Sequence, residues 1–192
     1  MIVVLGRPEL DERGALSGRA GRVAAAAAGA GAGVELVGSV TDDGNGDATI
    51  TALGREHIGH AAVLRMPTSG EPRLDAADIE LGLRYVTECR VLVLAAALDE
   101  PAMAAAVDGA RYHRAALVVA AAQRALPNAD ELPEQTTVLS APDEDDGAFA
   151  DLVGRYAAQL DGGRDAAEAW RDALSSTGWE AAADDMGAGA ET

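Results

Sequence analysis

The chain has 192 residues and a formal net charge of −17, because it carries 32 acidic residues against 15 basic ones, all of them arginine. A surface this acidic repels the phosphates of nucleic acids and anionic lipids, so we expect neither nucleic acid nor membrane as a partner. The single cysteine, Cys89, excludes an intramolecular disulfide framework and a cysteine-based zinc cluster. It favours a reducing compartment, and we expect a cytoplasmic protein.

The acidic excess has two interpretations. Many acids, no lysine and few aromatic residues suit a salt-rich cytoplasm, where ions screen the repulsion between like charges. A GC-rich genome also enriches alanine, glycine and arginine, but codon bias does not by itself explain the acids. Salt adaptation predicts an unfolding midpoint that rises between low and molar KCl.

Short apolar strands alternate with alanine-rich helices in the first part of the chain. In chain order we expect a strand at 2–5, a helix at 19–30, a strand at 34–40, a helix at about 46–56 and a strand at 61–66. Gly29, Gly31 and Gly33 are spaced like a dinucleotide-binding loop, but such a loop follows a strand and opens a helix. Here the order is reversed, which predicts a helix cap and a tight turn.

The same alternation continues to residue 176. We expect helices at 75–88, 100–113, 145–161 and 165–176, and strands at 91–97, 116–122 and 136–139. Near-continuous apolar strands separated by helices predict a mostly parallel sheet covered on both faces, in a three-layer α/β/α fold. We expect residues 1–179 to form this single domain. Residues 180–192 lack a periodic apolar face and are expected to form a disordered acidic tail.

Three segments of the N-terminal half carry a family resemblance. Residues 6–11 (GRPELD) follow the first strand, residues 17–28 (SGRAGRVAAAAA) open the first helix, and residues 37–46 (VGSVTDDGNG) follow from the second strand. Together they resemble the ribokinase-like (PfkB) carbohydrate kinases. Members of that family phosphorylate sugars, nucleosides and related alcohols with ATP and Mg²⁺, so the resemblance implies a ribokinase-like fold.

The resemblance also implies that Asp11, Gly18 and Asp42 bind the substrate. Asp11 follows the carboxyl end of the first strand, where open α/β sheets bind ligands. Its alternative role is that of a solvated acid in a loop. Two residues depart from the family motifs, since Glu9 and Arg22 each stand where the family has asparagine.

Residues 143–174 resemble the family's helix that begins with Gly-Ala-Gly-Asp and carries the catalytic aspartate. Alignment on the Ala-Phe pair that follows places residues 144–147 (EDDG) on that motif, with Gly147 at the catalytic position and in the cofactor-binding turn. A shift by one residue puts Asp146 there as the base but loses the Ala-Phe match. Acids at this turn suit the helix dipole, yet each would repel a phosphate by roughly 1 to 4 kcal/mol at ~4 Å.

Two parts of the family's chain are missing. Between Asp11 and Gly18 there is no room for the family's small β-sheet lid, so we expect a short connection that leaves Asp11 open to water. Residues 123–146 replace several strands of the family and its Asn-x-x-Glu motif. Residues 128–131 (NADE) are either a vestige of that motif or a plain polar loop.

The sequence thus predicts a shortened, degenerate ribokinase-like domain without its lid. We expect a non-catalytic binding or assembly protein that takes a small sugar or nucleoside and needs no cofactor. No metal site is expected, because His57 and His60 have no third ligand nearby. One alternative is a minimal kinase that uses Mg-ATP, with Asp11 on the substrate hydroxyls and Asp146 as base. The other is a regulatory subunit that pairs with an intact kinase. As protein partners we expect a second copy of the chain, in a homo-oligomer, or such a kinase.

Overall fold

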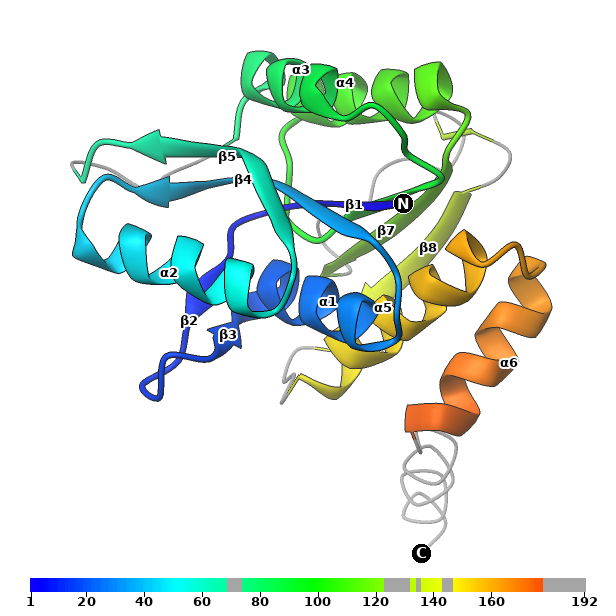
Figure 1. Ribbon diagram of the computed structural model, residues 1–192. Helices are drawn as coiled ribbons and strands as arrows, with labels where there is room; N and C mark the ends of the chain where they lie inside the picture. The colour runs from blue at the N-terminus through cyan, green and yellow to red at the C-terminus, as the bar shows by residue number, and fades with distance from the viewer. Residues whose placement is uncertain (69–73, 123–131, 134–135, 143–146, 178–192) are drawn as a thin grey trace, which may run out of the picture.

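Six strands form one sheet in the computed structural model of the chain (Figure 1), which describes residues 1–68, 74–122, 132–133, 136–142 and 147–177. The strands are β1 (Ile2–Leu5), β4 (Val34–Thr41), β5 (Gly59–Met66), β6 (Val91–Leu94), β7 (Ala116–Ala122) and β8 (Thr136–Ala141). Their order across the sheet is β5-β4-β1-β6-β7-β8, and every neighbouring pair is parallel.

Helices cover both faces of this sheet. On one face lie α1 (Gly18–Gly29), α2 (Gly44–Arg55), α5 (Ala148–Asp161) and α6 (Ala166–Thr177), and on the other lie α3 (Ala76–Tyr85) and α4 (Glu100–His113). In β1, Ile2 and Val4 join the first core, whereas Val3 and Leu5 join the second. All four side chains are buried, which explains why the strand is apolar at every position. The predicted three-layer architecture is confirmed.

The predicted helices and strands all occur, and most end within two residues of their expected limits. Strand β6 is shorter than expected. It ends at Leu94, and the chain then turns toward α4. Helix α3 ends at Tyr85 because Val86 adopts an extended conformation and buries its side chain. The glycine-rich turn is confirmed as a helix end, with Gly31 in the left-handed region at φ 89°.

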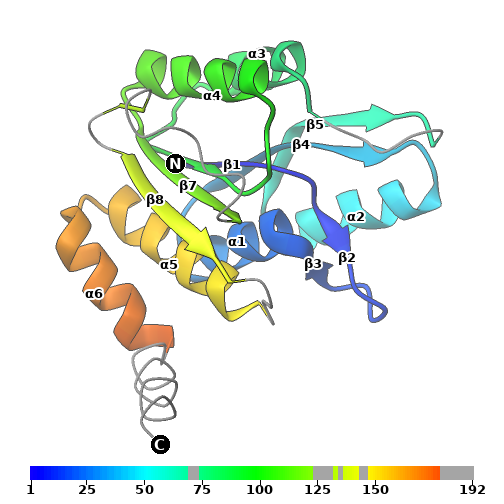
Figure 2. The same cartoon turned by 180° about the vertical axis from the view of Figure 1, so that it is seen from behind.

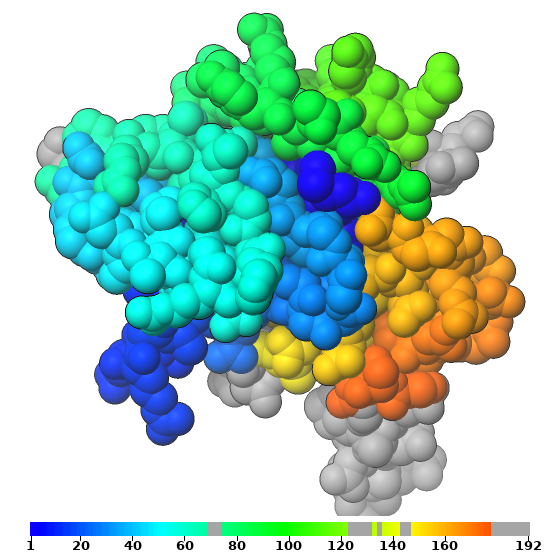
Figure 3. Space-filling view, in the orientation of Figure 1, coloured from blue at the N-terminus to red at the C-terminus, as the bar shows by residue number. Residues whose placement is uncertain are grey.

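A short hairpin joins β1 to α1. Its strands, β2 (Glu9–Leu10) and β3 (Leu16–Ser17), pair antiparallel over two residues each. The hairpin projects from the rest of the molecule in the space-filling view (Figure 3). Asp11 lies in its turn with an exposed side chain, so the short connection expected between Asp11 and Gly18 takes the form of this hairpin.

Helices α1 and α5 pack side by side at short range. A Cβ added to Gly154 of α5 would lie 2.5 Å from the carbonyl oxygen of Val23 and 2.7 Å from the Cβ of Ala26. The small residues on both helices therefore set the close approach. This packing brings Arg22, on the first turns of α1, next to Gly147 at the start of α5.

Several predictions concern residues outside the described part of the chain. They include Asp146, the segment 128–131 and the tail 180–192, so these stay predictions. Within the described residues, none of the helices is long and apolar enough to cross a membrane.

Candidate functional site

The sheet has a topological switch point beside its central strand. From β1, the strands β4 and β5 lie on one side and β6, β7 and β8 on the other. Open α/β sheets bind ligands at such a point, in the crevice beyond the carboxyl ends of the strands. The crevice between β1 and β6 is therefore the first place to search for a site.

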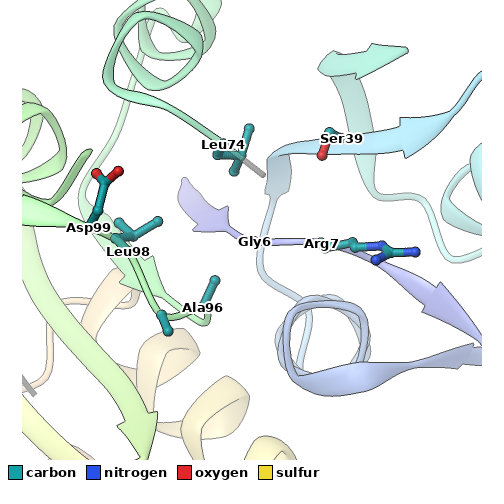
Figure 4. A pocket seen from close by; sticks show the side chains of 8 residues that line it. Gly6, Arg7, Ser39, Leu74, Ala96, Leu98 and Asp99 are labelled. Atoms are coloured by element: carbon teal, nitrogen blue, oxygen red, sulfur yellow. The ribbon is translucent and has the colours of Figure 1, made fainter. Parts of the chain in front are cut away.

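A cavity of about 490 Å³ occupies this crevice (Figure 4). It is lined by the segments that continue β1 and β6, by one residue of β4 and by one that precedes α3: Gly6, Arg7, Ser39, Leu74, Ala96, Ala97, Leu98 and Asp99. Most of this wall is apolar or backbone. The polar side chains of the wall are those of Arg7, Ser39 and Asp99. A mostly apolar wall with a few polar side chains is typical of small-molecule sites.

Ser39 is the most informative residue of the cavity. Its side chain is 1% exposed, and its hydroxyl oxygen makes no hydrogen bond with any described residue. Figure 4 shows this oxygen pointing from β4 toward the Gly6–Arg7 segment. A buried hydroxyl without a partner costs about 1 to 3 kcal/mol, and such groups require an explanation in a folded protein. Protein atoms cover this oxygen, so a ligand hydroxyl in the cavity would become its partner only after a local shift of the wall.

The other two polar side chains already have structural contacts. The Asp99 carboxylate caps α4 by accepting a hydrogen bond from the backbone N–H of Ala102 at 3.0 Å. The Arg7 guanidinium lies 4.0 Å from the Glu9 carboxylate, and both side chains are exposed. Weak ion pairs of this kind rearrange at little cost, so Arg7 is able to turn toward a bound molecule.

Glycines shape the wall of the cavity beside β1. A Cβ on Gly38 would overlap the carbonyl oxygen of Gly6, and a Cβ on Gly6 would lie 2.7 Å from the Cβ of Ala20. These two positions therefore let β1, β4 and α1 approach one another closely at their ends. Gly38 belongs to the segment that best matches the family motif, so part of that match has a packing cause.

A second, smaller cavity of about 200 Å³ lies beneath the hairpin. It is lined by Arg7, Pro8, Glu9, Leu10, Val40, Thr41, Asn45, Gly46 and Thr49. The N-terminus of α2 borders it, but this helix end is already capped. The Asp43 carboxylate accepts hydrogen bonds from the backbone N–H groups of Asn45 and Gly46, each at 3.0 Å, and from the Thr41 hydroxyl at 2.7 Å.

The three residues predicted to bind substrate do not meet in the larger cavity. Asp11 accepts hydrogen bonds from the backbone of Ala15 and Arg13, both at 2.9 Å, and the bond from Ala15 is the main reason that the pKa of its carboxyl is lowered. Asp42 lies 3.5 Å from the Arg65 guanidinium. Gly18 opens α1 at φ 66°, where it faces the Glu9 side chain.

The start of α5 differs from the start of α2. Its N-cap, Gly147, has φ 103° and makes no side-chain capping hydrogen bond. A Cβ on Gly147 would overlap the guanidinium of Arg22, so this cation fills the space directly above the glycine. Asp146 precedes Gly147 in the sequence and lies outside the described residues.

Two other candidate groups are structural. Among the described residues, no group of three histidine, cysteine, aspartate or glutamate side chains could hold a metal ion. His60 Nδ1 lies 3.0 Å from the carbonyl oxygen of Ile58. Burial raises the pKa of the Cys89 thiol to about 12, so this side chain stays protonated and is not a nucleophile at neutral pH.

Sequence reasoning missed Ser39 and Asp99 as cavity residues. Ser39 lies within the segment 37–46 that matches the family motif, and Asp99 directly precedes the helix expected at 100–113. The available signal was positional, because both residues come at or after the end of an apolar strand. The strand order decides which strand ends meet at the switch point. No local segment of the sequence reveals that order.

The fold has clear counterparts among solved structures. A protein of Escherichia coli described as a ribokinase II, in its apo form, superposes with a TM-score of 0.65 at 13% identity, covering 90% of this chain and 89% of that one. Phosphofructokinase-2 of E. coli, in complex with substrates and products, gives 0.62 at 13% identity, with 92% and 91% covered. A protein of Thermotoga maritima described as a 1-phosphofructokinase gives 0.64 at 12%, with 92% and 91% covered.

Comparison of the sequence finds no relative, in contrast to comparison of the structure. No protein-family model and no curated protein sequence matches the chain. Identities of 12% to 14% across solved structures carry the architecture but no activity. The expected resemblance is confirmed at the level of the fold, and the chain has a ribokinase-like α/β fold.

Proposed function

We propose that this chain is a ligand-binding domain of ribokinase-like fold that does not transfer phosphate. The observation that carries the proposal is the start of α5, where Gly147 stands at the position aligned with the catalytic aspartate and the Arg22 guanidinium lies over it. A glycine offers no carboxylate to orient or deprotonate an attacking hydroxyl. The loss of such a base lowers a rate by roughly 10²–10⁴-fold.

The same helix end is a poor fit for Mg-ATP. Backbone N–H groups at a helix N-terminus bind phosphate when the space in front of them is open. Here the Arg22 guanidinium occupies the place of a Gly147 side chain, and four acids in succession, residues 143–146, precede Gly147 in the sequence. The guanidinium attracts phosphate, but a single cation does not offset four carboxylates. We therefore expect no phosphoryl transfer at this helix end.

The cavity between β1 and β6 supports the binding part of the proposal. Its Ser39 hydroxyl, which has no hydrogen-bond partner among the described residues, is buried in a mostly apolar wall, and Arg7 and Asp99 lie at other points of the lining. This combination suits a small polyhydroxylated molecule such as a sugar or a nucleoside. Apolar faces of the ligand would contact Leu74 and Leu98, while a ligand hydroxyl would hydrogen-bond to Ser39.

The first experiment measures nucleotide binding. Calorimetry with Mg-ATP at 0.1 M and 2 M KCl should give no binding at millimolar nucleotide, because the acids remain even when salt screens them. The Gly147→Asp variant should stay inactive for the same reason. Micromolar ATP binding by the wild-type chain would contradict the proposal. So would ADP release that needs an added sugar and disappears in Asp146→Ala, since that result would establish the minimal kinase.

The second experiment tests the cavity through Ser39. Ser39→Ala should leave the free protein as stable as the wild type or more stable, since it removes a buried hydroxyl without a partner. The same variant should lose most of the thermal shift that a binding sugar or nucleoside produces in a ligand panel.

Thr49→Val is the matched control for this experiment. Thr49 is also buried, but its hydroxyl donates to the carbonyl oxygen of Asn45 at 2.9 Å, so its loss should cost about 1 kcal/mol. It should leave the ligand shift intact. The cavity would not be the binding site if no ligand in the panel shifted the melting temperature, or if Ser39→Ala left the shift unchanged. Either outcome would leave the nucleotide-binding experiment unaffected.

A further inference from the structure

Asp99 is the acid in the described wall of the cavity between β1 and β6. One oxygen of its carboxylate accepts the hydrogen bond from the backbone N–H of Ala102 that caps α4. Within the described part of the chain the carboxylate has no further hydrogen bond and no ion pair, and its side chain is exposed. The cap therefore leaves the second oxygen available to a molecule in the cavity.

The other polar side chains of the wall do not bond this oxygen. The Ser39 hydroxyl oxygen is covered by protein atoms. Arg7 is the one cation among the described residues of the wall, and its guanidinium lies 4.0 Å from the Glu9 carboxylate. In Figure 4 the Arg7 side chain extends away from Leu98 and Asp99. A donor for the second oxygen of Asp99 must therefore come from water or from a ligand.

The charged side chains of the cavity belong to opposite sides of the sheet. Figure 2 shows α4, which Asp99 caps, on one face, and the hairpin β2–β3, which carries Glu9, on the other. The Arg7–Glu9 pair thus belongs to the hairpin side, and no described cation pairs with Asp99. Residues 69–73, which precede Leu74 and lie outside the described part, contain one acid and one arginine and so add no net charge.

We propose that this cavity selects a small polyol that carries a protonated amine, such as an amino sugar, with Asp99 as the counter-ion of the ammonium group. This inference rests on the proposed function, since it concerns the ligand of the same cavity. An ammonium group brings three N–H donors and one positive charge, so it supplies the carboxylate with a hydrogen bond and an ion pair together. Leu74 and Leu98 would contact the carbon face of the ring, as they would for a neutral sugar.

The charge of the whole chain acts in the same direction. A net charge of −17 raises the concentration of small cations near the surface and lowers that of anions, and a crevice strengthens this effect. A sugar phosphate or a sugar acid would have to draw Arg7 away from Glu9 while it lies near Asp99. A cationic ligand meets neither obstacle, so the amine is the ionic form of ligand that the charges of this cavity favour.

Calorimetry with matched pairs of sugars tests the preference. Glucosamine, galactosamine and mannosamine each differ from the parent hexose only by an amine in place of one hydroxyl. At pH 6.5, where the amine is protonated, and in 0.1 M KCl, at least one amine should bind about tenfold more tightly than its parent, because a close charge pair at a protein surface supplies such a factor. Equal binding within every pair overturns this inference but leaves the proposed function standing, because the sugars still bind.

Asp99→Asn tests the residue. Asparagine is as good an N-cap as aspartate and keeps the start of α4, but it carries no charge, so the amine and its parent should bind equally. Asp75→Asn is the matched control. Asp75 caps α3 by accepting a hydrogen bond from the backbone N–H of Asp78 at 2.8 Å, and it is not part of the described wall of the cavity. This variant should keep the full preference, and unfolding midpoints show whether both variants keep their fold.

The inference is also overturned if Asp99→Asn keeps the preference, if Asp75→Asn loses it to the same extent, or if no amine of the panel binds. A hexose that binds where no amine does would leave the cavity as the ligand site and remove only the amine preference. If neither kind of sugar binds, the cavity is not a hexose site, and the nucleotide-binding experiment still tests the absence of phosphate transfer.

Discussion

The N-termini of α2 and α5 lie at the same edge of the sheet, and their sequences resemble two glycine-containing motifs of one family. At α2 the carboxylate of Asp43 satisfies the first backbone N–H groups, and the helix start is closed by the chain itself. At α5 the cap is Gly147, without a side-chain hydrogen bond, under the guanidinium of Arg22. The first end is capped by a side chain of its own N-cap residue, and at the second the Arg22 guanidinium lies beside an N-cap glycine.

The difference between the two helix starts shows that a motif match can have a structural cause. The segment 37–46 gives the best match to the family, yet its features have local causes. Gly38 and Gly46 stand where a Cβ would overlap a carbonyl oxygen, and Asp43 caps a helix. A sequence pattern with such local causes indicates the fold and not an activity. The α5 start, where the match is poorer, is where the chemistry of a kinase would depend on the side chains.

The largest expected effect comes from filling the tight turn at α2. Gly46→Ala places a Cβ on the carbonyl oxygen of Thr41, a backbone atom that cannot move without disturbing the end of β4. We expect a loss of about 3 kcal/mol in the free energy of unfolding, measured with urea. Gly44→Ala, two residues earlier, meets nothing within 4 Å and should change stability little. Helix propensity by itself favours alanine over glycine at both positions, so equal changes at the two would show that the close approach to Thr41 does not decide.

A smaller effect is expected at α5, and it should depend on Arg22. Gly147→Ala should cost about 2 kcal/mol, because φ 103° strains an L-residue and the new methyl group displaces the guanidinium. In an Arg22→Ala background the second cause disappears. A double-mutant cycle should therefore give a coupling of about 1 kcal/mol. Simple additivity would show that the guanidinium does not hold its place over Gly147.

Most of the fold could be predicted from the sequence, for a physical reason. A parallel sheet between two helix layers needs strands that are apolar at every position, and residues 2–5 and 91–94 are short apolar runs of this kind between expected helices. The ends of β6 and α3 were harder to predict. At Val86 the burial of one side chain outweighs the helical propensity of its neighbours, and this balance is set by tertiary contacts.

Much less of the candidate site could be predicted. Asp11, Gly18 and Asp42 were selected from single segments, and the structure places them in a hairpin turn, at a helix start and in an ion pair. Ser39 and Asp99 are 60 positions apart in the sequence, and they line one cavity because β4 and β6 flank β1. Strand order depends on long-range contacts, so local patterns do not reveal which side chains share a cavity.

The smallest expected effect is the pH dependence of the α2 cap. Hydrogen bonds from the backbone of Gly46, from the Thr41 hydroxyl and from the backbone of Asn45 lower the pKa of the Asp43 carboxyl below its ordinary value of 3.8. The native state thus favours the ionised form. Its contribution to stability is complete above the pKa of the unfolded chain and is lost as the pH falls through the lower pKa of the folded state.

Asp43→Asn separates this charge from the cap, because asparagine keeps a capping oxygen but does not titrate. The wild type should unfold at a higher urea concentration than the variant at pH 6, and the difference should shrink as the pH falls below 3.8. Asp42→Asn serves as the control, since the Asp42 carboxylate contacts Arg65 and caps no helix. A difference for Asp43→Asn that stays constant from pH 6 to pH 2 would mean that the ionised carboxylate is not what closes the start of α2. The two helix ends would then differ in shape alone.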